Sequence, residues 1–235
     1  INPNLRDCNF PSKSLAGVGV AFYLMLALRT FLRDQGWFDE RGIAIPNLAE
    51  LLDLVALGTV ADVVPLDANN RILTWQGMSR IRAGKCRPGI KALLEVANRD
   101  PQKLAASDLG FALGPRLNAA GRLDDMSVGV ALLLCDNIGE ARVLANELDA
   151  LNQTRKEIEQ GMQVEALTLC EKLERSRDTL PGGLAMYHPE WHQGVVGILA
   201  SRIKERFHRP VIAFAPAGDG TLKGSGRSIQ GLHMR

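Results

Sequence analysis

The feature that most constrains this chain is the stretch from residue 139 to residue 178, which contains no proline and one interior glycine, Gly161. Its apolar residues recur mostly in steps of three and four, the spacing of one face of an amphipathic helix. An unbroken helix of this length would extend roughly 55–60 Å, which exceeds the diameter of one small domain. A bundle helix is one interpretation, but the position between two blocks of different composition favours a connector between domains. The run Pro181-Gly182-Gly183 predicts where the helix stops.

The blocks on either side of this stretch differ in charge. The 235 residues are 46% hydrophobic and 23% charged, a globular composition with a net charge of only +2. Residues 179–235 hold 7 basic and 3 acidic residues and all four histidines. An anionic partner must therefore be held by local groups of basic residues, and we expect those groups in the last block.

Two further features concern location. The apolar run from Leu15 to Leu28 is shorter than the roughly 20 residues that cross a bilayer, so we expect a buried helix and no membrane segment. The four cysteines form no C-x-x-C pair, which is typical of reduced thiols in a cytoplasmic protein.

The periodicity of the remaining sequence predicts an α/β fold. Before the long helix we expect helices over residues 14–35, 48–57, 70–83, 89–97 and 127–135, and another opened by Ser107 and Asp108. After it we expect a strand over 183–188, a helix over 194–207, a strand over 210–216 and a strand with a tight turn over 222–229. The expected division is a mainly helical domain at 1–137, a connecting helix at 138–178 and the start of an α/β domain at 179–235.

The segment LGTVADVVPL, residues 57–66, places the carboxylate of Asp62 in an apolar stretch, and we expect Gly58 and Thr59 to end the preceding helix. A carboxylate in apolar surroundings costs several kcal/mol unless it is paired or bound to a metal. Asp62 is therefore a candidate metal ligand. The alternative, an aspartate that caps the next turn, is the commoner case on chemistry alone.

The segment LGPRLNAAGRLDD, residues 113–125, groups Arg116, Asn118 and Arg122 with glycine and alanine. Small residues let a ligand approach the backbone, and arginine offers a planar fork for phosphate oxygens. Arg122 could instead pair with Asp124 or Asp125 on a surface turn. This segment is the second candidate binding site.

The segment HPEWHQGVVGI, residues 188–198, follows a predicted strand and opens a predicted helix. His188 and His192 have the i, i+4 spacing of helical zinc sites, but Pro189 argues against a helix there and the glutamate of H-E-x-x-H is missing. Gly194 and Gly197 lie instead at a helix N-terminus, which favours an anion. His192 is thus a candidate phosphate contact or proton donor.

The segment KGSGRS, residues 223–228, combines glycine, serine, lysine and arginine. It indicates a phosphate clamp formed by Ser225, Gly226, Arg227 and Ser228. A solvated hairpin turn is the alternative interpretation.

Five motifs, in order, resemble the DHH phosphoesterase superfamily, and within it the bacterial exonucleases that degrade single-stranded DNA from 5′ to 3′. They are INPN…CNFPSKSLAGVGVAF at residues 1–22, LGTVADVVPL, LGPRLNAAGRLDD, HPEWHQGVVGI and KGSGRSI. The resemblance covers the entire chain and implies the C-terminal part of a DHH domain, a long connecting helix and the start of a DHHA1 domain, with a nuclease cleft between the domains. The D-H-H triplet and the first acidic motifs of the family are missing here, so we interpret the chain as an internal piece of a longer protein.

The resemblance also implies roles for individual residues. Asp62 would be a catalytic ligand of a Mn²⁺ or Mg²⁺ pair, most of whose ligands precede this sequence. Arg116, Asn118 and Arg122 would lie on the substrate side. His192, together with Ser225, Gly226, Arg227 and Ser228, would hold DNA phosphates near the 5′ end.

The implied function is metal-dependent exonuclease activity in DNA recombination and repair, in the cytoplasm and away from membranes. The implied partners are single-stranded DNA and, by family resemblance, a single-strand-binding protein and a RecQ-type helicase. One alternative is another phosphoesterase of the family, hydrolysing oligonucleotides, cyclic dinucleotides or pyrophosphate. The other is a non-catalytic nucleic-acid-binding scaffold on a DHH core. By itself this chain is expected to be inactive, because it keeps one carboxylate of the metal set.

Overall fold

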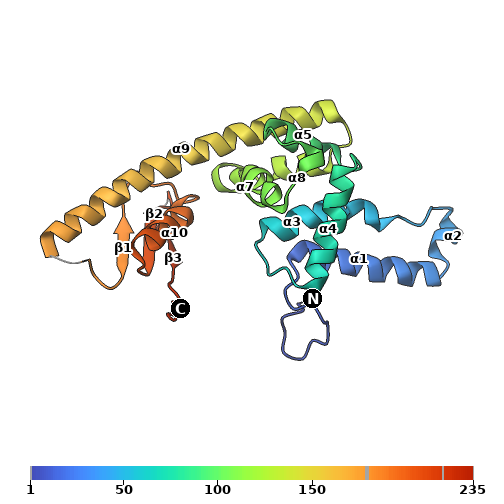
Figure 1. The fold of residues 1–235 in the computed structure, drawn as a ribbon, viewed down its shortest axis with the longest axis horizontal. Helices are drawn as coiled ribbons and strands as arrows, with labels where there is room; N and C mark the ends of the chain where they lie inside the picture. The colour runs from blue at the N-terminus through green and yellow to red at the C-terminus, as the bar shows by residue number, and fades with distance from the viewer. Residues whose placement is uncertain (1, 178–179, 219, 235) are drawn as a thin grey trace. The chain divides into compact units, whose positions relative to one another are not determined.

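The computed structural model describes residues 2–177, 180–218 and 220–234. Ile1 of the first motif and the expected domain boundary at 178–179 therefore lie outside the described residues. The chain divides into two compact units (Figure 1). The helical unit comprises Ile1–Ala120 and Met126–Asp149, and the C-terminal unit comprises Gly121–Asp125 and Ala150–Arg235. Helix α9 (Ile138–Arg177) is continuous over 40 residues, as its periodicity predicts, and contributes residues to both units.

The helical unit is built of short helices joined by tight connections. They are α1 (Gly17–Asp34), α2 (Trp37–Arg41), η1 (Leu48–Leu51), α3 (Leu52–Ala61), α4 (Ala68–Arg82), α5 (Pro88–Val96), η2 (Pro101–Lys103), α6 (Ala106–Asp108), the π-helical turn η3 (Leu109–Leu113), α7 (Gly114–Leu123) and α8 (Ser127–Leu134). Several of these helices begin at a residue whose side chain caps the helix N-terminus. The Asn47 carboxamide accepts the Ala49 N–H, and the Asp67 carboxylate accepts the Asn70 N–H.

Helix α3 is the centre of the helical unit, and its small residues allow close packing. A Cβ at Gly58 would lie 2.8 Å from Val18 Cγ1, and a Cβ at Gly77 would lie 2.0 Å from the Leu52 carbonyl oxygen. The expectation that Gly58 and Thr59 end this helix is wrong, because α3 continues to Ala61. Gly58 is a packing residue that brings α1 close, and the helix ends only at Asp62.

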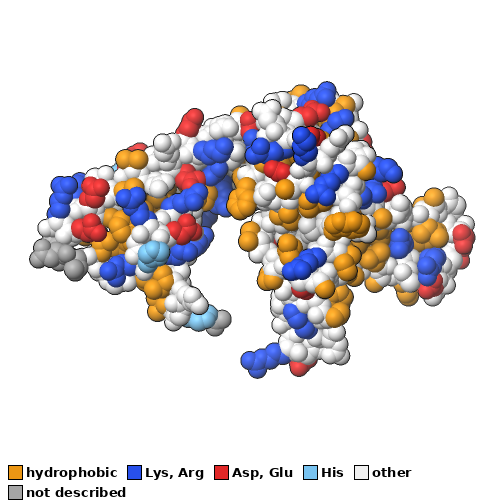
Figure 2. Space-filling model, in the orientation of Figure 1, with side chains coloured by type: hydrophobic (Ala, Val, Ile, Leu, Met, Phe, Trp, Pro, Cys, Tyr) orange, Lys and Arg blue, Asp and Glu red, His pale blue; other side chains and the backbone are white. Residues whose placement is uncertain are grey.

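Helix α1 is less buried than its apolar sequence predicts. Phe22 is buried on the side that packs against α3, whereas Leu24, Leu28 and Phe31 are exposed on another stripe of the helix. Figure 2 shows hydrophobic side chains reaching the surface of the helical unit among basic ones. None of the described helices is both long and apolar enough to span a membrane.

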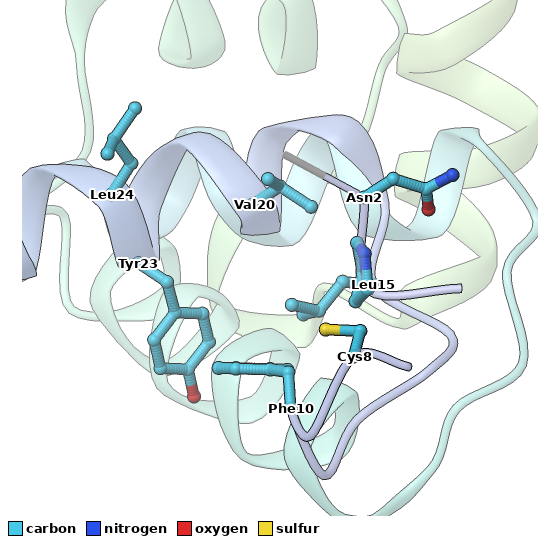
Figure 3. A pocket seen from close by; sticks show the side chains of 8 residues that line it. Asn2, Cys8, Phe10, Leu15, Val20, Tyr23 and Leu24 are labelled. Carbon is cyan, nitrogen blue, oxygen red and sulfur yellow. The ribbon is translucent and has the colours of Figure 1, made fainter. Parts of the chain in front are cut away.

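The first turns of α1 and the segment before it enclose an apolar cavity of about 290 Å³ (Figure 3). Phe10 and Tyr23 meet edge to face at 5.1 Å on one side of it, and Cys8 and Leu15 lie beside them. No described residue that lines this cavity is charged.

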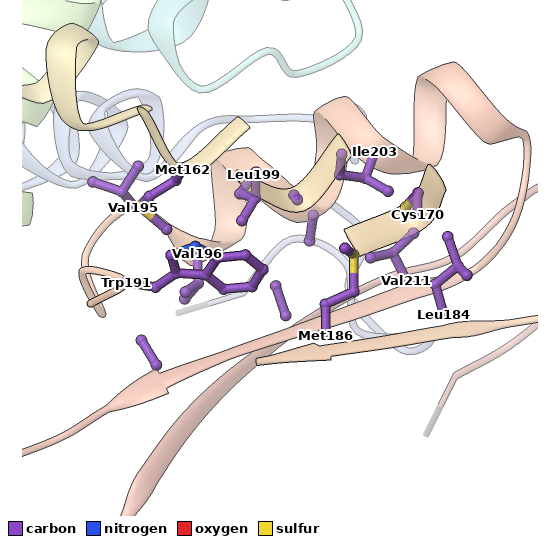
Figure 4. Packing of buried hydrophobic residues seen from close by; sticks show 14 residues of the cluster. Met162, Cys170, Leu184, Met186, Trp191, Val195, Val196, Leu199, Ile203 and Val211 are labelled. Carbon is purple, nitrogen blue, oxygen red and sulfur yellow. The ribbon is translucent and has the colours of Figure 1, made fainter. Parts of the chain in front are cut away.

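The C-terminal unit is a three-stranded mixed sheet covered by helix. Strand β1 (Leu184–Tyr187) pairs in parallel with β2 (Val211–Pro216), and β2 pairs antiparallel with β3 (Leu222–Arg227). Parallel pairing requires a crossover, which α10 (Val196–Phe207) provides. Figure 4 shows side chains of α9, α10 and the strands packed around Trp191, whose indole N–H donates to Glu165 Oε2 at 2.8 Å. This element order confirms the expected α/β class.

Candidate functional site

The segment 223–228 lies mostly in strand β3, and no tight turn interrupts it. Ser225 pairs with Ala213 of β2, and Arg227 pairs with Val211. Because side chains alternate along a strand, Ser225 and Arg227 project from the same face. The linking turn lies earlier, where Gly218 and Gly220 adopt positive φ values of 89° and 81°. The turn expected within KGSGRS is therefore wrong, since the glycines that supply left-handed backbone precede the strand.

The guanidinium of Arg227 is held on three sides by its own unit. Its Nε donates to Ser201 Oγ at 3.0 Å, and its Nη1 donates to Ser225 Oγ at 3.0 Å and to the Gly226 carbonyl at 2.8 Å. An arginine fixed in this way presents its remaining donors in a defined direction.

The first turn of α10 lies directly against this guanidinium. A Cβ at Gly197 would lie 2.9 Å from Arg227 Nη2 and 3.1 Å from Ser225 Oγ, so this glycine leaves room for both groups. Amides at this helix start already donate, those of Gly194 and Val195 to His192 and that of Ile198 to Val195, so the helix start favours an anion mainly through its dipole. The arginine and the helix start therefore face the same space.

Arg122 of α7 approaches the same helix start. A Cβ at Gly194 would lie 2.0 Å from the Arg122 carbonyl oxygen, and Arg122 Nη1 donates to the Gly194 carbonyl at 3.3 Å. Although Arg122 is in contact with solvent, burial by its surroundings, followed by repulsion from Arg155 and Arg227, lowers the pKa of its guanidinium. An anion bound here would relieve that repulsion.

These groups surround a cavity of about 300 Å³ within the C-terminal unit. Its described lining contains three cationic side chains and no acidic one, together with two polar side chains and small residues: Arg122, Lys223, Arg227, Gln193, Ser225, Gly121, Gly194, Gly197, Gly224 and Val196. Such a lining selects an anion of phosphate size.

The nearby carboxylate of Glu159 on α9 is already engaged. It is 8% exposed, forms an ion pair with Arg155, and accepts from Arg202 Nε at 3.1 Å. Arg155 Nη2 also donates to Asn152 Oδ1 at 2.9 Å. Glu159 thus forms its direct ion pairs with arginines that do not line the cavity, while its charge also favours the protonated form of Arg122.

Two other predicted residues lie beside the cavity but not in its lining. His192 Nδ1 accepts the Gly194 N–H at 3.1 Å, which fixes the ring and places the proton of the neutral form on Nε2. The Ser228 hydroxyl donates to the carbonyls of Leu232 and Ile229, so it is turned toward the following turn.

Asp62 lies in the helical unit, at the C-terminal end of α3. It lines a cavity of about 510 Å³ together with Asn118 of α7 and several apolar side chains. The apolar stretch around Asp62 does not bury it, because Asp62 is exposed although apolar side chains line the same cavity. It lies at the helix end, where Val63 adopts a positive φ of 56° and turns the chain outward.

The other residues of the 113–125 segment have structural partners. Arg116 is 12% exposed, and its Nε pairs with Asp149 Oδ1 at 2.8 Å. Ala119 and Ala120 are fully buried, so their small size serves helix packing and does not admit a ligand to the backbone. Within this segment, Asn118 lines the cavity of Asp62, and Arg122 lines the cavity of Arg227.

The metal site can be tested against the residues that the structure describes. Among residues 2–177, 180–218 and 220–234, no three His, Cys, Asp or Glu side chains are close enough to hold a metal ion. Mg²⁺ and Mn²⁺ prefer several oxygen ligands. Asp62 and Asn118 offer one carboxylate and one carboxamide, which fit part of such a ligand set.

Three polar residues of the site were not predicted from the sequence. Lys223 and Gln193 lie in two of the segments described but were not singled out, and Ser201 lies four residues after Gly197. The i, i+4 spacing places Gly197 and Ser201 on one helix face, but only the position of β3 gives that face a role.

The chain was compared with known proteins. Residues 181–235 match the family model described as the DHHA1 domain. Over all 235 residues the chain is 99% identical to the single-stranded-DNA-specific exonuclease RecJ of Escherichia coli (strain K12) and 37% identical to that of Bacillus subtilis (strain 168). It spans 41% and 27% of those proteins, less than half the length of either relative.

Solved structures agree with these relatives. The crystal structure of RecJ from Thermus thermophilus in complex with Mg²⁺ is 35% identical, with a TM-score of 0.75 over 97% of this chain and 32% of that one. A crystal structure of exonuclease RecJ bound to manganese is 34% identical, with a TM-score of 0.74 over 99% of this chain and 53% of that one. Sequence and fold both confirm the resemblance carried by the five motifs, because over its whole length the chain is similar to part of proteins named RecJ.

Proposed function

We propose that the whole protein to which this chain corresponds is a metal-dependent exonuclease that degrades single-stranded DNA from 5′ to 3′ in recombination and repair. The observation that carries the proposal is the cationic cavity around Arg227, at the start of α10. The names of the relatives support single-stranded DNA as the substrate.

The cavity is suited to a DNA phosphate near the 5′ end. Arg227 and Arg122 offer planar donors, Lys223 adds charge, and Ser225 adds a hydroxyl. Hydrogen bonds from charged donors to phosphate are shorter and stronger than neutral ones. Contacts of this kind bind any sequence, as an exonuclease requires.

The helical unit would contribute to the chemistry through Asp62. A bound pair of Mg²⁺ or Mn²⁺ ions would activate water and stabilise the leaving oxygen. Asp62 would be one ligand, Asn118 would lie on the substrate side of the same cavity, and most other ligands would come from outside this chain. Arg116, which is paired with Asp149, would act by holding α7 in place.

His192 and Ser228 would have supporting roles. His192 would donate its Nε2 proton to a phosphate oxygen, because Nδ1 is occupied by the Gly194 N–H. Ser228 and Gly226 would fix the end of β3 through their own hydrogen bonds and so stabilise the DNA-binding strand.

The setting of the reaction is also a proposal. By family resemblance the protein would act in the cytoplasm, with a single-strand-binding protein and a RecQ-type helicase supplying the unwound strand. Its four free cysteines fit a reducing compartment. Co-purification of a tagged full-length protein with and without DNase treatment would separate direct partners from partners bridged by DNA.

The experiment that tests the proposal is Arg227→Lys in the full-length protein. Lysine keeps the positive charge but lacks the planar guanidinium, which can donate to two phosphate oxygens at once. Degradation of 5′-phosphorylated single-stranded DNA should therefore fall by about tenfold or more. DNA with a 5′-hydroxyl should be affected less if the cavity holds the terminal phosphate. Arg206→Lys, a change at the exposed far end of α10, is the matched control.

Two outcomes would change the assignment. Equal losses on both substrates would assign Arg227 to an internal phosphate. Unchanged rates on both would contradict a phosphate-binding role for this cavity.

A further inference from the structure

The guanidinium of Arg227 rests on a two-residue site on α10. Gly197 and Ser201 are four residues apart, so they share one face of the helix. Ser201 Oγ donates to the Gly197 carbonyl at 3.2 Å and accepts from Arg227 Nε at 3.0 Å. Gly197 lies against Arg227 Nη2, since a Cβ there would approach that nitrogen to 2.9 Å. We call Gly197 and Ser201 the arginine seat.

The hydrogen bonds of the Arg227 guanidinium show what the arginine seat does. A guanidinium carries five N–H groups. Nε donates to Ser201, and Nη1 donates to Ser225 Oγ and to the Gly226 carbonyl. Within the described part of the chain, Nη2 donates no hydrogen bond, so both of its N–H groups remain for a ligand. The seat therefore engages Nε directly and lies against Nη2, while Arg227 and Gly197 line the same cavity.

We propose that Gly197 and Ser201 are positioning residues for phosphate recognition, which hold Arg227 in its anion-binding orientation before the substrate arrives. The inference rests on the proposed function, since it assumes that Arg227 binds a DNA phosphate. A free arginine side chain must be ordered when it binds, and an arginine already seated avoids that entropic cost. Neither seat residue needs to touch the phosphate.

Gly197→Ala tests whether the position of Arg227 affects binding without a loss of protein stability. Alanine favours a helix more than glycine does, so thermal stability should stay the same or rise. The added methyl group meets the side-chain ends of Arg227 and Ser225 and not backbone, so the fold can accommodate it if the guanidinium is displaced from its position. We expect affinity for a short 5′-phosphorylated oligothymidylate to fall by about tenfold in the full-length protein, measured with EDTA to prevent cleavage. Gly161→Ala on α9, where a Cβ meets nothing within 4 Å, is the control.

Ser201→Ala removes the acceptor for Arg227 Nε and should weaken the same binding by about tenfold. Ser201→Thr keeps the oxygen and should restore most of the affinity. Thr168→Ala is the matched control, because Thr168 makes the same type of hydroxyl bond to the carbonyl four residues earlier, at 3.0 Å, on an exposed face of α9.

A double-mutant cycle completes the test. In an Arg227→Ala background, Ser201→Ala should have no further effect on binding, because the group it positions is gone. A further loss of similar size in that background would overturn the inference, since Ser201 would then act independently of Arg227. Wild-type affinity in both seat variants would overturn it as well, even if Arg227→Lys binds weakly. Wild-type affinity in Arg227→Lys and Arg227→Ala would instead count against the proposed function of the cavity.

Discussion

Asp62→Ala tests the role of a single carboxylate. In the full-length protein we expect turnover to fall far more than tenfold while affinity for single-stranded DNA is largely kept. On the proposed function, chemistry would need the metal ligand, whereas affinity would depend mostly on phosphate contacts elsewhere. Steady-state cleavage and a binding measurement in EDTA give the two values.

The control for this change is Asp100→Ala, which removes another carboxylate of the helical unit, one that caps η2. Its turnover should match the wild type. If Asp62→Ala kept turnover within roughly tenfold, a change of about 1.4 kcal/mol in the barrier, Asp62 would be a structural cap.

Two arginines of the 113–125 segment have different surroundings in the structure, although the sequence predicts the same role for both. Arg116 and Arg122 lie six positions apart and looked equivalent in the sequence, yet one is tied to Asp149 and the other lines a cationic cavity. Their difference depends on partners that are distant in the sequence, Asp149 and Gly194. No local pattern reports such partners.

Elements whose signals are local were predicted well. The long helix α9, the start of α5 at Pro88 and the strand–helix–strand–strand order of the C-terminal unit all follow from periodicity, caps and breakers. The short helix α2 was missed, and Gly58 was misread as a helix end. A glycine that ends a helix and a glycine that admits a neighbouring helix are identical in sequence, and only tertiary packing separates them.

Gly77→Ala tests close packing between elements. Its Cβ would lie 2.0 Å from the Leu52 carbonyl oxygen and 2.5 Å from Ala56 Cβ, so α4 must move away from α3. Overpacking of this kind typically costs about 1–3 kcal/mol, and a clash with backbone belongs at the upper end. Differential scanning calorimetry should show a clearly lower Tm for the unit that contains these helices.

Gly161→Ala provides the opposite case on α9, where the new methyl group meets nothing within 4 Å. Its Tm should be equal to or higher than that of the wild type. The reason is that alanine stabilises a helix by roughly 0.5–1 kcal/mol relative to glycine. A similar loss in both variants would show that helix α4 does not pack on α3 as closely as described.

The proposed function assigns binding and chemistry to different portions of the protein. The groups around Arg227 all belong to the C-terminal unit of this chain, whereas the described residues offer one carboxylate and one carboxamide for a metal. A divalent metal pair needs several oxygen or nitrogen ligands for each ion. On the proposed function, the chain would therefore carry a phosphate-binding cavity and only part of a catalytic centre.

The 235-residue chain expressed alone should accordingly release no nucleotides from single-stranded DNA with either Mn²⁺ or Mg²⁺, while still binding a 5′-phosphorylated oligonucleotide more tightly than its 5′-hydroxyl counterpart. Gel-based cleavage assays and fluorescence anisotropy measure the two properties, and Arg227→Ala should remove the preference in binding. Metal-dependent nucleotide release that Asp62→Ala abolished would contradict the prediction, because it would mean that the ligands within this chain suffice to hold the catalytic metals. Release that persisted in Asp62→Ala would instead identify a contaminating nuclease, since the carboxylate proposed to hold the metal would be gone and the activity would remain.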